Sequence, residues 1–384
     1  MIDKNKFKDY NIILINLDGL RRNKVKLCPT LKALSENSLY FSNIDTVAPY
    51  TFASLHALFS GLYPSTNGVN AYYNMFKFKK NNITTLPQLF KKLDYYTCCD
   101  INSKSVMPEQ GYDEYTVYDE KIINFTKRHI ELIKKLSNKK FFLFLQNTET
   151  HNNLVRTIIE KYKNKTSDED YFTDTERNDQ VYDSHLGATD NYISKIKETL
   201  QELKIDDKTI LILFSDHGTS IGEKVGEKFY GVFLYEYTLN VFAIFDIPGV
   251  SPKIINTSCS TIDIFPTLCD LFSIPEENFD PKQGNSLLNL LDDTNSTNNE
   301  LFAETGGLYG PWPSPKKHNV FCVKINQKKL IYNDTPQTWE FYDLKNDPTE
   351  NKNIYNQESN DILFFKKRLD YYLKINNIKT NFHL

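Results

Sequence analysis

The chain has 384 residues, which excludes a peptide or a disulfide-stapled mini-protein and suits one large globular domain with an appended piece. Hydrophobic residues make up 40% and charged residues 25% of the chain, proportions that exclude disordered, collagen-like and coiled-coil proteins. With 46 basic and 49 acidic residues the net charge is −3, so nucleic acid and anionic membranes are not attracted overall, and an anionic substrate must be captured locally.

Four short apolar runs predict buried strands, at residues 12–17, 141–145, 209–214 and 241–245. Because both faces of each run are apolar, the strands belong inside a sheet that is covered on both sides. Helical patterns lie between and after the runs, at residues 29–37, 52–60, 85–93, 120–136, 181–203 and 262–272. This alternation predicts an α/β fold, a three-layer sandwich with a large mixed, mostly parallel sheet.

One stretch inside this region differs from the core. Residues 161–179 are polar, charged and almost free of aliphatic side chains. This composition predicts a mobile insertion, and two interpretations stay open: it lies over the site, or it is a solvated loop without function.

A second polar stretch, at residues 291–300, is typical of a linker. Strand-like segments follow it at 320–325 and 329–332, and an amphipathic helix is expected around 362–373. These elements predict a small C-terminal α+β subdomain. The chain is therefore divided into a large domain at 1–295 and a subdomain at 296–384 that packs on it.

The beginning of the chain and its cysteines bear on location. The first apolar run is interrupted by Asn16 and ends at Asp18, too early for a signal peptide, and no later run reaches the roughly 18 apolar residues of a membrane span. Six scattered cysteines, two of them adjacent at Cys98 and Cys99, fit neither a zinc pair nor a disulfide framework. We expect reduced, mostly buried thiols in a cytoplasmic protein without a membrane span.

Polar residues follow the predicted strands, at the carboxyl ends where α/β folds form their sites. Asp18 follows the first strand in NLDGLR, and Asp216 and His217 follow another in LFSDHG. Their oxygen and nitrogen atoms are three ligands suited to Mn²⁺, Zn²⁺ or Mg²⁺. Each of the two segments taken alone is also explained as a turn.

Thr51 precedes a predicted helix in the segment APYTFASLHALFSGLYPSTNGV. The first N–H groups of a helix and the positive end of its dipole favour a bound oxyanion, a placement that suits a nucleophile. The alternative interpretation is that Thr51 caps the helix, a role that threonine serves well.

Taken together, these segments resemble the alkaline phosphatase superfamily, specifically its sulfatase-like branch. NIILINLDGLR resembles the first strand and metal-binding Asp of that family, TFASLHALFSGLYPSTNGV its nucleophile helix, and TILILFSDHGTSIGE its S-D-H-G strand and loop. Further matches, in the same order as in the family, are CPTLKALSENSLYFSN, VYDSHLGATDNYISKIKETL, LYEYTLNVFAIFDIPGV, STIDIFPTLCDLFSI and FYDLKNDPTENKNI. The resemblance spans nearly the whole chain.

The resemblance implies a metal-dependent site. Asp18, Thr51, Asp216 and His217 would bind one divalent ion (Mn, Zn or Mg, with a second ion left open), and Thr51 would be both ligand and nucleophile. Metal coordination explains how a threonine hydroxyl becomes reactive, and a covalent phospho-threonine would form. By position, His151 corresponds to the substrate-binding His of the family, and as a catalytic residue it could hold a substrate oxygen or protonate the leaving group.

Several positions depart from the family pattern. Formylglycine sulfatases need Cys or Ser where this chain has Thr51, so sulfate-ester hydrolysis by that route is not expected. Threonine there resembles the phosphoryl-handling members instead. Shortly before the Leu-Tyr-Glu segment at residues 234–236, many relatives carry His or Lys, whereas this chain has Tyr230. The remaining candidates for substrate binding are Tyr230, His318 and Lys228, with Lys224 as an alternative to Lys228. A second metal would need further ligands, and the residues considered for it, though not favoured, are Asn147 and His185.

The sequence thus predicts a metal-dependent phosphoryl-transfer enzyme that cleaves a phosphodiester or similar ester through Thr51. Whether it is a hydrolase or a transferase that moves a phospho-substituent to or from a saccharide is left open. Its partner would be a small-molecule or saccharide phosphoester, since aromatic residues such as Tyr72 and Tyr230 suit a sugar or a nucleotide. Two alternatives stay open: a non-catalytic binding protein, and a strict phosphodiesterase or phosphonate monoester hydrolase acting with water. The oligomeric state is left open.

Overall fold

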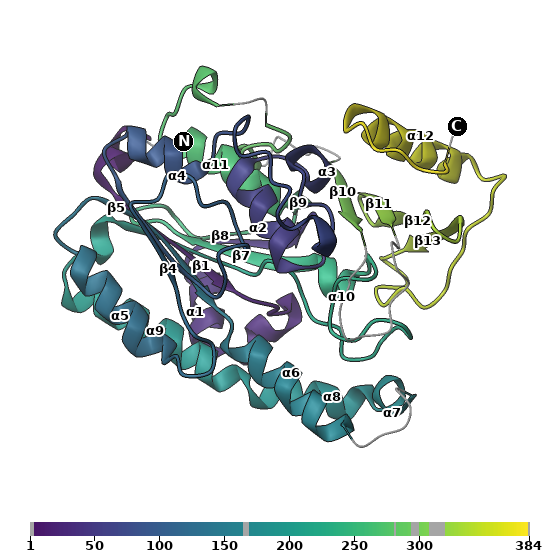
Figure 1. The fold of residues 1–384 in the computed structure, drawn as a ribbon, viewed down its shortest axis with the longest axis horizontal. Helices are drawn as coiled ribbons and strands as arrows, with labels where there is room; N and C mark the ends of the chain where they lie inside the picture. Colours follow the sequence, from purple (N-terminus) through teal and green to yellow (C-terminus); the bar gives the residue numbers. More distant parts are fainter. Residues whose placement is uncertain (1–3, 164–168, 280–281, 293–298, 307–318, 383–384) are drawn as a thin grey trace.

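The computed structural model describes residues 4–163, 169–279, 282–292, 299–306 and 319–382 and contains two sheets (Figure 1). The larger sheet has nine strands in the order β4-β3-β5-β1-β6-β7-β2-β8, with β9 paired to β2. Its strands are β1 (Asn11–Leu17), β2 (Leu39–Asp45), β3 (Tyr96–Ile101), β4 (Glu114–Val117), β5 (Phe141–Asn147), β6 (Thr209–Phe214), β7 (Asn240–Asp246), β8 (Lys253–Ile255) and β9 (Cys259–Ser260).

The pairing of the central strands decides where the site forms. β1 lies between β5 and β6 and runs parallel to both, whereas β7 is antiparallel to its neighbours β6 and β2. The predicted mixed, mostly parallel sheet is confirmed. The carboxyl ends of β1, β5 and β6 therefore meet at one edge of the sheet, where α/β folds place their sites.

Alternate residues of β1 enter two separate hydrophobic cores, one on each face of the sheet. Ile12 and Leu14 belong to the core under α2 (Thr51–Ser60), α4 (Leu86–Lys92) and α11 (Ile264–Leu271). Ile13 and Ile15 belong to the opposite core. The helices of that face are α1 (Pro29–Asn37), α5 (Phe125–Leu136), α6 (Glu149–Tyr162), α7 (Glu169–Thr173), α8 (Thr175–Ser184) and α9 (Leu186–Glu202), and Figure 1 shows α5 and α9 on the side of the sheet opposite α4 and α11.

Two helix predictions were wrong in their extent. The helix predicted from residue 120 begins at Phe125, because the Asn124 side chain accepts a hydrogen bond from Lys127 N at 2.9 Å and caps it there. The helix predicted over 181–203 is divided at His185 into the end of α8 and α9.

Part of the stretch predicted as a mobile insertion, residues 161–179, is helical, whereas its mobility and its place over the site stay predictions. Residues 169–173 and 175–179 lie in α7 and α8, while 164–168 lie outside the described residues. Tyr171 is buried and donates a hydrogen bond to Ser220 O at 3.0 Å. The sequence pattern missed this because a tyrosine and Asn178, rather than aliphatic residues, make the buried face.

The smaller sheet is antiparallel and belongs to the C-terminal part of the chain. Its strands are β10 (Glu300–Thr305), β11 (Val320–Ile325), β12 (Lys328–Asn333) and β13 (Thr338–Asp343), paired in that order. Helix α12 (Asn360–Ile375) packs on this sheet through Phe365 and Leu369. The predicted α+β subdomain is confirmed in its strands at 320–325 and 329–332 and its helix. Most of the predicted linker, residues 293–298, lies outside the described residues.

Buried charges join the two sheets. Lys324 Nζ lies 2.9 Å from Asp45 Oδ2 and 2.8 Å from Glu236 Oε2, and Lys329 Nζ lies 2.9 Å from Glu236 Oε1 and 2.7 Å from Glu350 Oε1. Both lysine side chains are almost completely buried. A strand of the small sheet is thereby fixed to the end of β2.

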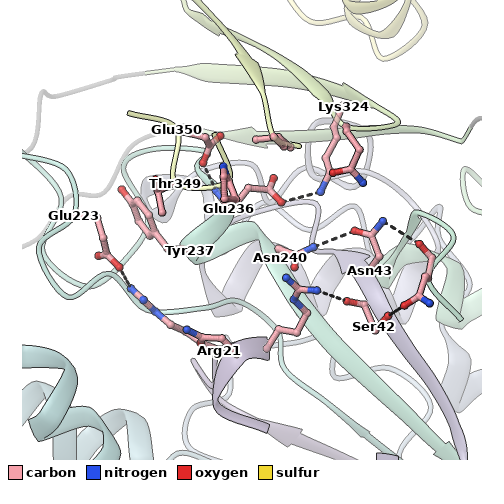
Figure 2. A pocket seen from close by; sticks show the side chains of 16 residues that line it. Arg21, Ser42, Asn43, Glu223, Glu236, Tyr237, Asn240, Lys324, Thr349 and Glu350 are labelled. Atoms are coloured by element: carbon pink, nitrogen blue, oxygen red, sulfur yellow. Dashed lines mark hydrogen bonds and ion pairs between the residues drawn. The ribbon is translucent and has the colours of Figure 1, made fainter. Parts of the chain in front are cut away.

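A cleft of about 460 Å³ lies along this seam (Figure 2). Two ion pairs lie in its lining, Arg21 with Glu223 at 2.5 Å and Lys324 with Glu236 at 2.8 Å. Both ion pairs are drawn in Figure 2. We interpret the cleft as the polar boundary between the two sheets.

We expect Lys324→Ala to lower the free energy of unfolding by about 3–5 kcal/mol, because it leaves Asp45 buried without its cation, whereas Glu236 keeps its ion pair with Lys329. Lys328→Ala is the matched control on the next strand, since its partner Asp361 is exposed and the loss should stay below about 1 kcal/mol. Urea unfolding of both variants measures the difference. Equal losses would contradict this account of the seam.

All six cysteines are free and buried, as predicted. Burial is the main cause that raises the pKa of the Cys98 thiol to about 12.

Within the part of the chain that the structure describes, no helix combines the length and the apolar character needed to cross a membrane.

Candidate active site

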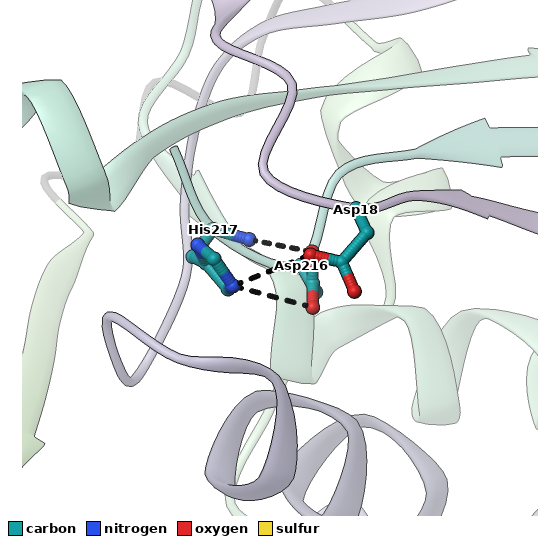
Figure 3. A group of neighbouring side chains, drawn as sticks. All are labelled: Asp18, Asp216 and His217. Atoms are coloured by element: carbon teal, nitrogen blue, oxygen red, sulfur yellow. Dashed lines mark hydrogen bonds and ion pairs between the residues drawn. The ribbon is translucent and has the colours of Figure 1, made fainter. Parts of the chain in front are cut away.

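Asp18, Asp216 and His217 come together at the predicted edge of the large sheet (Figure 3). Asp18 directly follows β1, and Asp216 and His217 follow the neighbouring β6, so the strand register brings them together. One ligand atom from each residue lies within 4.8 Å of the other two. His217 Nε2 lies 3.6 Å from Asp18 Oδ1 and 3.7 Å from Asp216 Oδ2.

Hydrogen bonds from the surrounding protein hold one carboxylate oxygen of Asp18, one of Asp216 and one ring nitrogen of His217. Gln146 Nε2 donates to Asp18 Oδ2 at 2.9 Å, and the Gly19 and His217 amides donate to Asp216 Oδ1 at 3.2 and 3.1 Å. His217 Nδ1 lies 2.7 Å from Gly218 O, and a carbonyl can only accept, so Nδ1 carries the hydrogen. The Nε2 lone pair is therefore turned toward the two carboxylates.

The remaining atoms fit a divalent cation. Asp18 Oδ1 and Asp216 Oδ2 are buried and have no hydrogen-bond partner among the residues that the structure describes. Burial raises the pKa of Asp18, and burial together with the Asp18 charge raises that of Asp216. Two facing carboxylates and an imidazole lone pair are costly to bury unless a cation lies between them. Two carboxylate oxygens and one imidazole nitrogen suit Mn²⁺, Zn²⁺ or Mg²⁺.

Thr51 is the first residue of α2, and its hydroxyl points at this group. Its Oγ1 lies 3.2 Å from His217 Nε2 and 3.4 Å from Asp18 Oδ2. Tyr50, not Thr51, occupies the cap position of the helix and makes no side-chain capping bond, so the interpretation of Thr51 as a cap is wrong. The free N–H groups of the first turn of α2 can therefore receive an oxyanion.

His151 lies in the first turn of α6, beside the same group. Its Nδ1 is 3.7 Å from Asp18 Oδ1 and has no hydrogen-bond partner. Burial, followed by the neighbouring His217, lowers the pKa of His151 to about 4. The imidazole is therefore neutral at neutral pH. Its role in substrate binding stays a prediction.

Tyr230 covers both imidazoles, with its ring centroid 4.7 Å from that of His217 and 5.1 Å from that of His151. Its hydroxyl lies close to that of Tyr72. Burial raises the pKa of Tyr230 to about 12.

Among the residues of this site, the sequence analysis did not predict Gln146, although a glutamine near the end of an apolar run was a usable signal.

The other candidates make different contacts, and of those that the structure describes only Asn147 lies beside Asp18, whose backbone N–H donates to Asn147 O at 3.0 Å. Lys228 lines a small cavity with Tyr171 and Phe229, and Lys224 Nζ donates to Glu350 O. His185 Nε2 and the Thr157 hydroxyl are hydrogen-bonded at 3.1 Å. Asn147, considered for a second metal, has its Oδ1 engaged by Glu149 N at 3.0 Å. His318 lies outside the described residues.

The loop that carries Tyr230 is braced by a buried carboxylate. Glu227 is fully buried, and its Oε1 accepts hydrogen bonds from Val232 N at 2.7 Å and Phe233 N at 2.9 Å. Burial is the main cause that raises the pKa of Glu227 from 4.5 to about 7. Ionisation of Glu227 therefore destabilises the fold. Protonated Glu227 contributes to the free energy of unfolding below pH 4.5, and this contribution is lost as the pH rises to about 7.

We expect Glu227→Gln to raise the free energy of unfolding by on the order of 2 kcal/mol at pH 8 and to change it little at pH 4.5. Glutamine is neutral at both pH values and can still accept both backbone hydrogen bonds. Urea unfolding at the two pH values measures the effect. A gain that does not depend on pH would contradict the ionisation of Glu227.

Comparison with known protein families gives two matches. The model of the family described as "Sulfatase" matches residues 10–274. The model described as "N-sulphoglucosamine sulphohydrolase, C-terminal" matches residues 226–374. The first match covers the whole of the large sheet and the group formed by Asp18, Asp216 and His217.

Among curated proteins, arylsulfatase K of Bos taurus is 29% identical over 186 residues, covering 45% of this chain and 32% of that protein. The chain spans about a third of the length of such relatives. A structure solved with its substrate D-glucosamine-2-N,6-O-disulfate has a TM-score of 0.75 at 16% identity, covering 96% of this chain and 98% of the other. The phosphonate monoester hydrolase of Agrobacterium radiobacter has a TM-score of 0.73 at 14% identity, covering 96% and 95%. At such identities the structural likeness establishes the fold.

Proposed function

The chain belongs to the sulfatase family, and from this premise we propose that it is a metal-dependent phosphoryl-transfer enzyme that cleaves a phosphodiester or phosphonate ester through a covalent Thr51 intermediate. One observation carries the proposal. Thr51 Oγ1 lies at the N-terminus of α2, within 3.4 Å of both Asp18 and His217. A hydroxyl so placed can reach an oxyanion held by the helix terminus.

In the first step, Thr51 Oγ1 attacks the phosphorus atom of the ester. A bond forms between Thr51 and phosphorus as the bond to the alcohol oxygen breaks. His151 is neutral and lies beside Asp18, so a ring N–H is available to donate a hydrogen bond to an ester oxygen. In the second step, water or a saccharide hydroxyl attacks phosphorus and releases Thr51.

A divalent ion held by Asp18, Asp216 and His217 would neutralise charge at the attacked centre and lower the pKa of the Thr51 hydroxyl. Gln146 holds Asp18 by its other oxygen, and two backbone amides hold Asp216 in the same way. The protein thus orients both carboxylates before any ligand enters. Such fixed orientation reduces the rearrangement needed during the reaction.

The threonine at position 51 supports phosphoryl rather than sulfuryl chemistry. Formylglycine is an aldehyde made from the CH₂ group of Cys or Ser, and the extra methyl group on the threonine Cβ excludes that product. The fold is shared with a phosphonate monoester hydrolase, which makes a phosphorus ester a reasonable substrate class for this chain. A saccharide as the alcohol or the acceptor is supported by the sulfated sugar bound to a protein of the same fold.

Hydrolysis of a sulfate ester is the second candidate function. The curated relatives that match this chain include arylsulfatases, which favours it. Thr51 would then attack sulfur directly, without formylglycine. A non-catalytic binding protein is the remaining alternative and predicts no turnover of either ester.

We expect Mn²⁺- or Zn²⁺-loaded protein to hydrolyse 4-nitrophenyl methylphosphonate or bis(4-nitrophenyl) phosphate faster than 4-nitrophenyl sulfate. All three reactions release the same coloured product, so one absorbance assay compares them. Protein treated with a chelator is the control and should be inactive. Faster release from the sulfate would favour the second candidate, and no release from any ester would favour a binding protein or a transferase that needs its own donor.

A further inference from the structure

Aromatic residues stand on both sides of Thr51 in the chain, Tyr50 before it and Phe52 after it. Tyr72 packs on both neighbours of Thr51, with ring centroids 4.8 Å from Tyr50 and 5.2 Å from Phe52. Tyr50 is completely buried, whereas Phe52, Tyr72 and Tyr230 are each partly exposed. The last three rings form what we call the aromatic wall of the site.

Two tyrosine hydroxyls join the halves of this wall. Tyr72 comes from the short helix η3 (Tyr72–Asn74), and Tyr230 comes from the loop after β6. Their hydroxyls lie close to each other, and the Tyr230 ring packs on both histidines, so the wall spans from the Thr51 side of the site to the two histidines.

The loop is built to hold Tyr230 in this place. Phe229, just before it, adopts a left-handed backbone with φ of +71°, a conformation that is costly for a bulky residue. Glu227 binds two amides at the far side of the loop, and Thr305 Oγ1 donates to Gly231 O at 2.8 Å. Bonds from both sides of Tyr230 therefore offset the cost of this backbone geometry.

We propose that Tyr72 and Tyr230 select the alcohol part of the substrate and favour an alcohol carried on a six-membered ring, aryl or pyranose, over an acyclic alcohol. This inference rests on the proposed function of Thr51. A six-membered ring has few rotatable bonds, so its flat π face (aryl) or its C–H face (pyranose) can pack against an aromatic side chain with little loss of conformational freedom. The hydroxyl pair lies at the edge of the same surface and can exchange hydrogen bonds with ring hydroxyls.

Binding can be measured without turnover in the metal-loaded Thr51→Ala protein. The probes are the phenyl, cyclohexyl and ethyl esters of methylphosphonate, which share one acid and differ only in the alcohol. Titration calorimetry gives the dissociation constant of each ester for Thr51→Ala and for the same protein with Tyr72→Leu, Tyr72→Phe or Phe76→Leu added. Phe76 is the matched control, because it lies in the same segment and its ring is 81% exposed.

We expect Tyr72→Leu to weaken binding of the phenyl and cyclohexyl esters about three- to tenfold and that of the ethyl ester little. Tyr72→Phe, which keeps the ring, should restore most of the affinity, and Phe76→Leu should change nothing. Equal losses for all three esters, or none, would overturn the inference. Affinity for Mn²⁺ is measured beside them and should not change, which excludes general damage to the site.

Inorganic phosphate separates failure of this inference from failure of the proposed function. If the metal-loaded protein binds phosphate but not the ring esters, the selection by Tyr72 and Tyr230 is wrong and the proposed function stands. If it binds neither, both are wrong.

Discussion

Replacing Thr51 with alanine will lower ester turnover by roughly a thousandfold or more, the scale seen when a covalent nucleophile is removed. Its Oγ1 is the hydroxyl that faces both Asp18 and His217, so no other atom of α2 can take its place. Release of 4-nitrophenol by the metal-loaded variant measures the loss. Affinity for Mn²⁺ should fall much less, because Asp18, Asp216 and His217 remain.

Ser60→Ala is the matched control for Thr51→Ala. Ser60 is a buried hydroxyl residue at the other end of the same helix, where it donates to His56 O at 2.6 Å. Turnover should be nearly unchanged in this variant. A Thr51→Ala protein that binds metal and keeps normal turnover would contradict the nucleophile assignment.

Replacing Asp216 with asparagine will lower the affinity for Mn²⁺ or Zn²⁺ by about a hundredfold or more. This loss is larger than the roughly ten- to hundredfold loss in metal affinity that is typical when a residue that only hydrogen-bonds to a metal ligand is replaced. Removing one of two facing carboxylates will at the same time stabilise the metal-free protein, since burial and the Asp18 charge already raise the pKa of Asp216. Titration calorimetry gives the affinity. Thermal unfolding with and without a chelator gives the stability.

Asp207→Asn controls for the loss of one charge, because Asp207 is exposed at the opposite end of β6. Its metal affinity and thermal unfolding should match those of the unchanged protein. Should Asp216→Asn still gain stability from metal as the unchanged protein does, the metal would have to bind elsewhere.

The core of the fold could be predicted from the sequence because its central strands are apolar on both faces. β6 was predicted with its bounds, and β1, β5 and β7 to within two residues at each end. Strands β3, β10 and β13 were not predicted, since each mixes polar and apolar residues and only tertiary pairing stabilises it. Helix ends were misplaced where a single side chain decides them, as Asn124 does.

The site was predictable where residues follow strand ends, as Asp18, Asp216 and His217 do. The place of His151 followed only from the family resemblance. The contact of Tyr72 with Tyr50 could not be read from the sequence, because only tertiary packing brings the two rings together. The cytoplasmic location and the division of the chain at residue 295 stay predictions.

The most direct test of the account is the mass of the protein during turnover. Metal-loaded protein is mixed with bis(4-nitrophenyl) phosphate, quenched with acid, digested and analysed by mass spectrometry. We predict a phosphorus-containing adduct on the peptide that carries Thr51, with none in Thr51→Ala. Turnover with no adduct, or an adduct on another residue, would contradict the covalent role of Thr51.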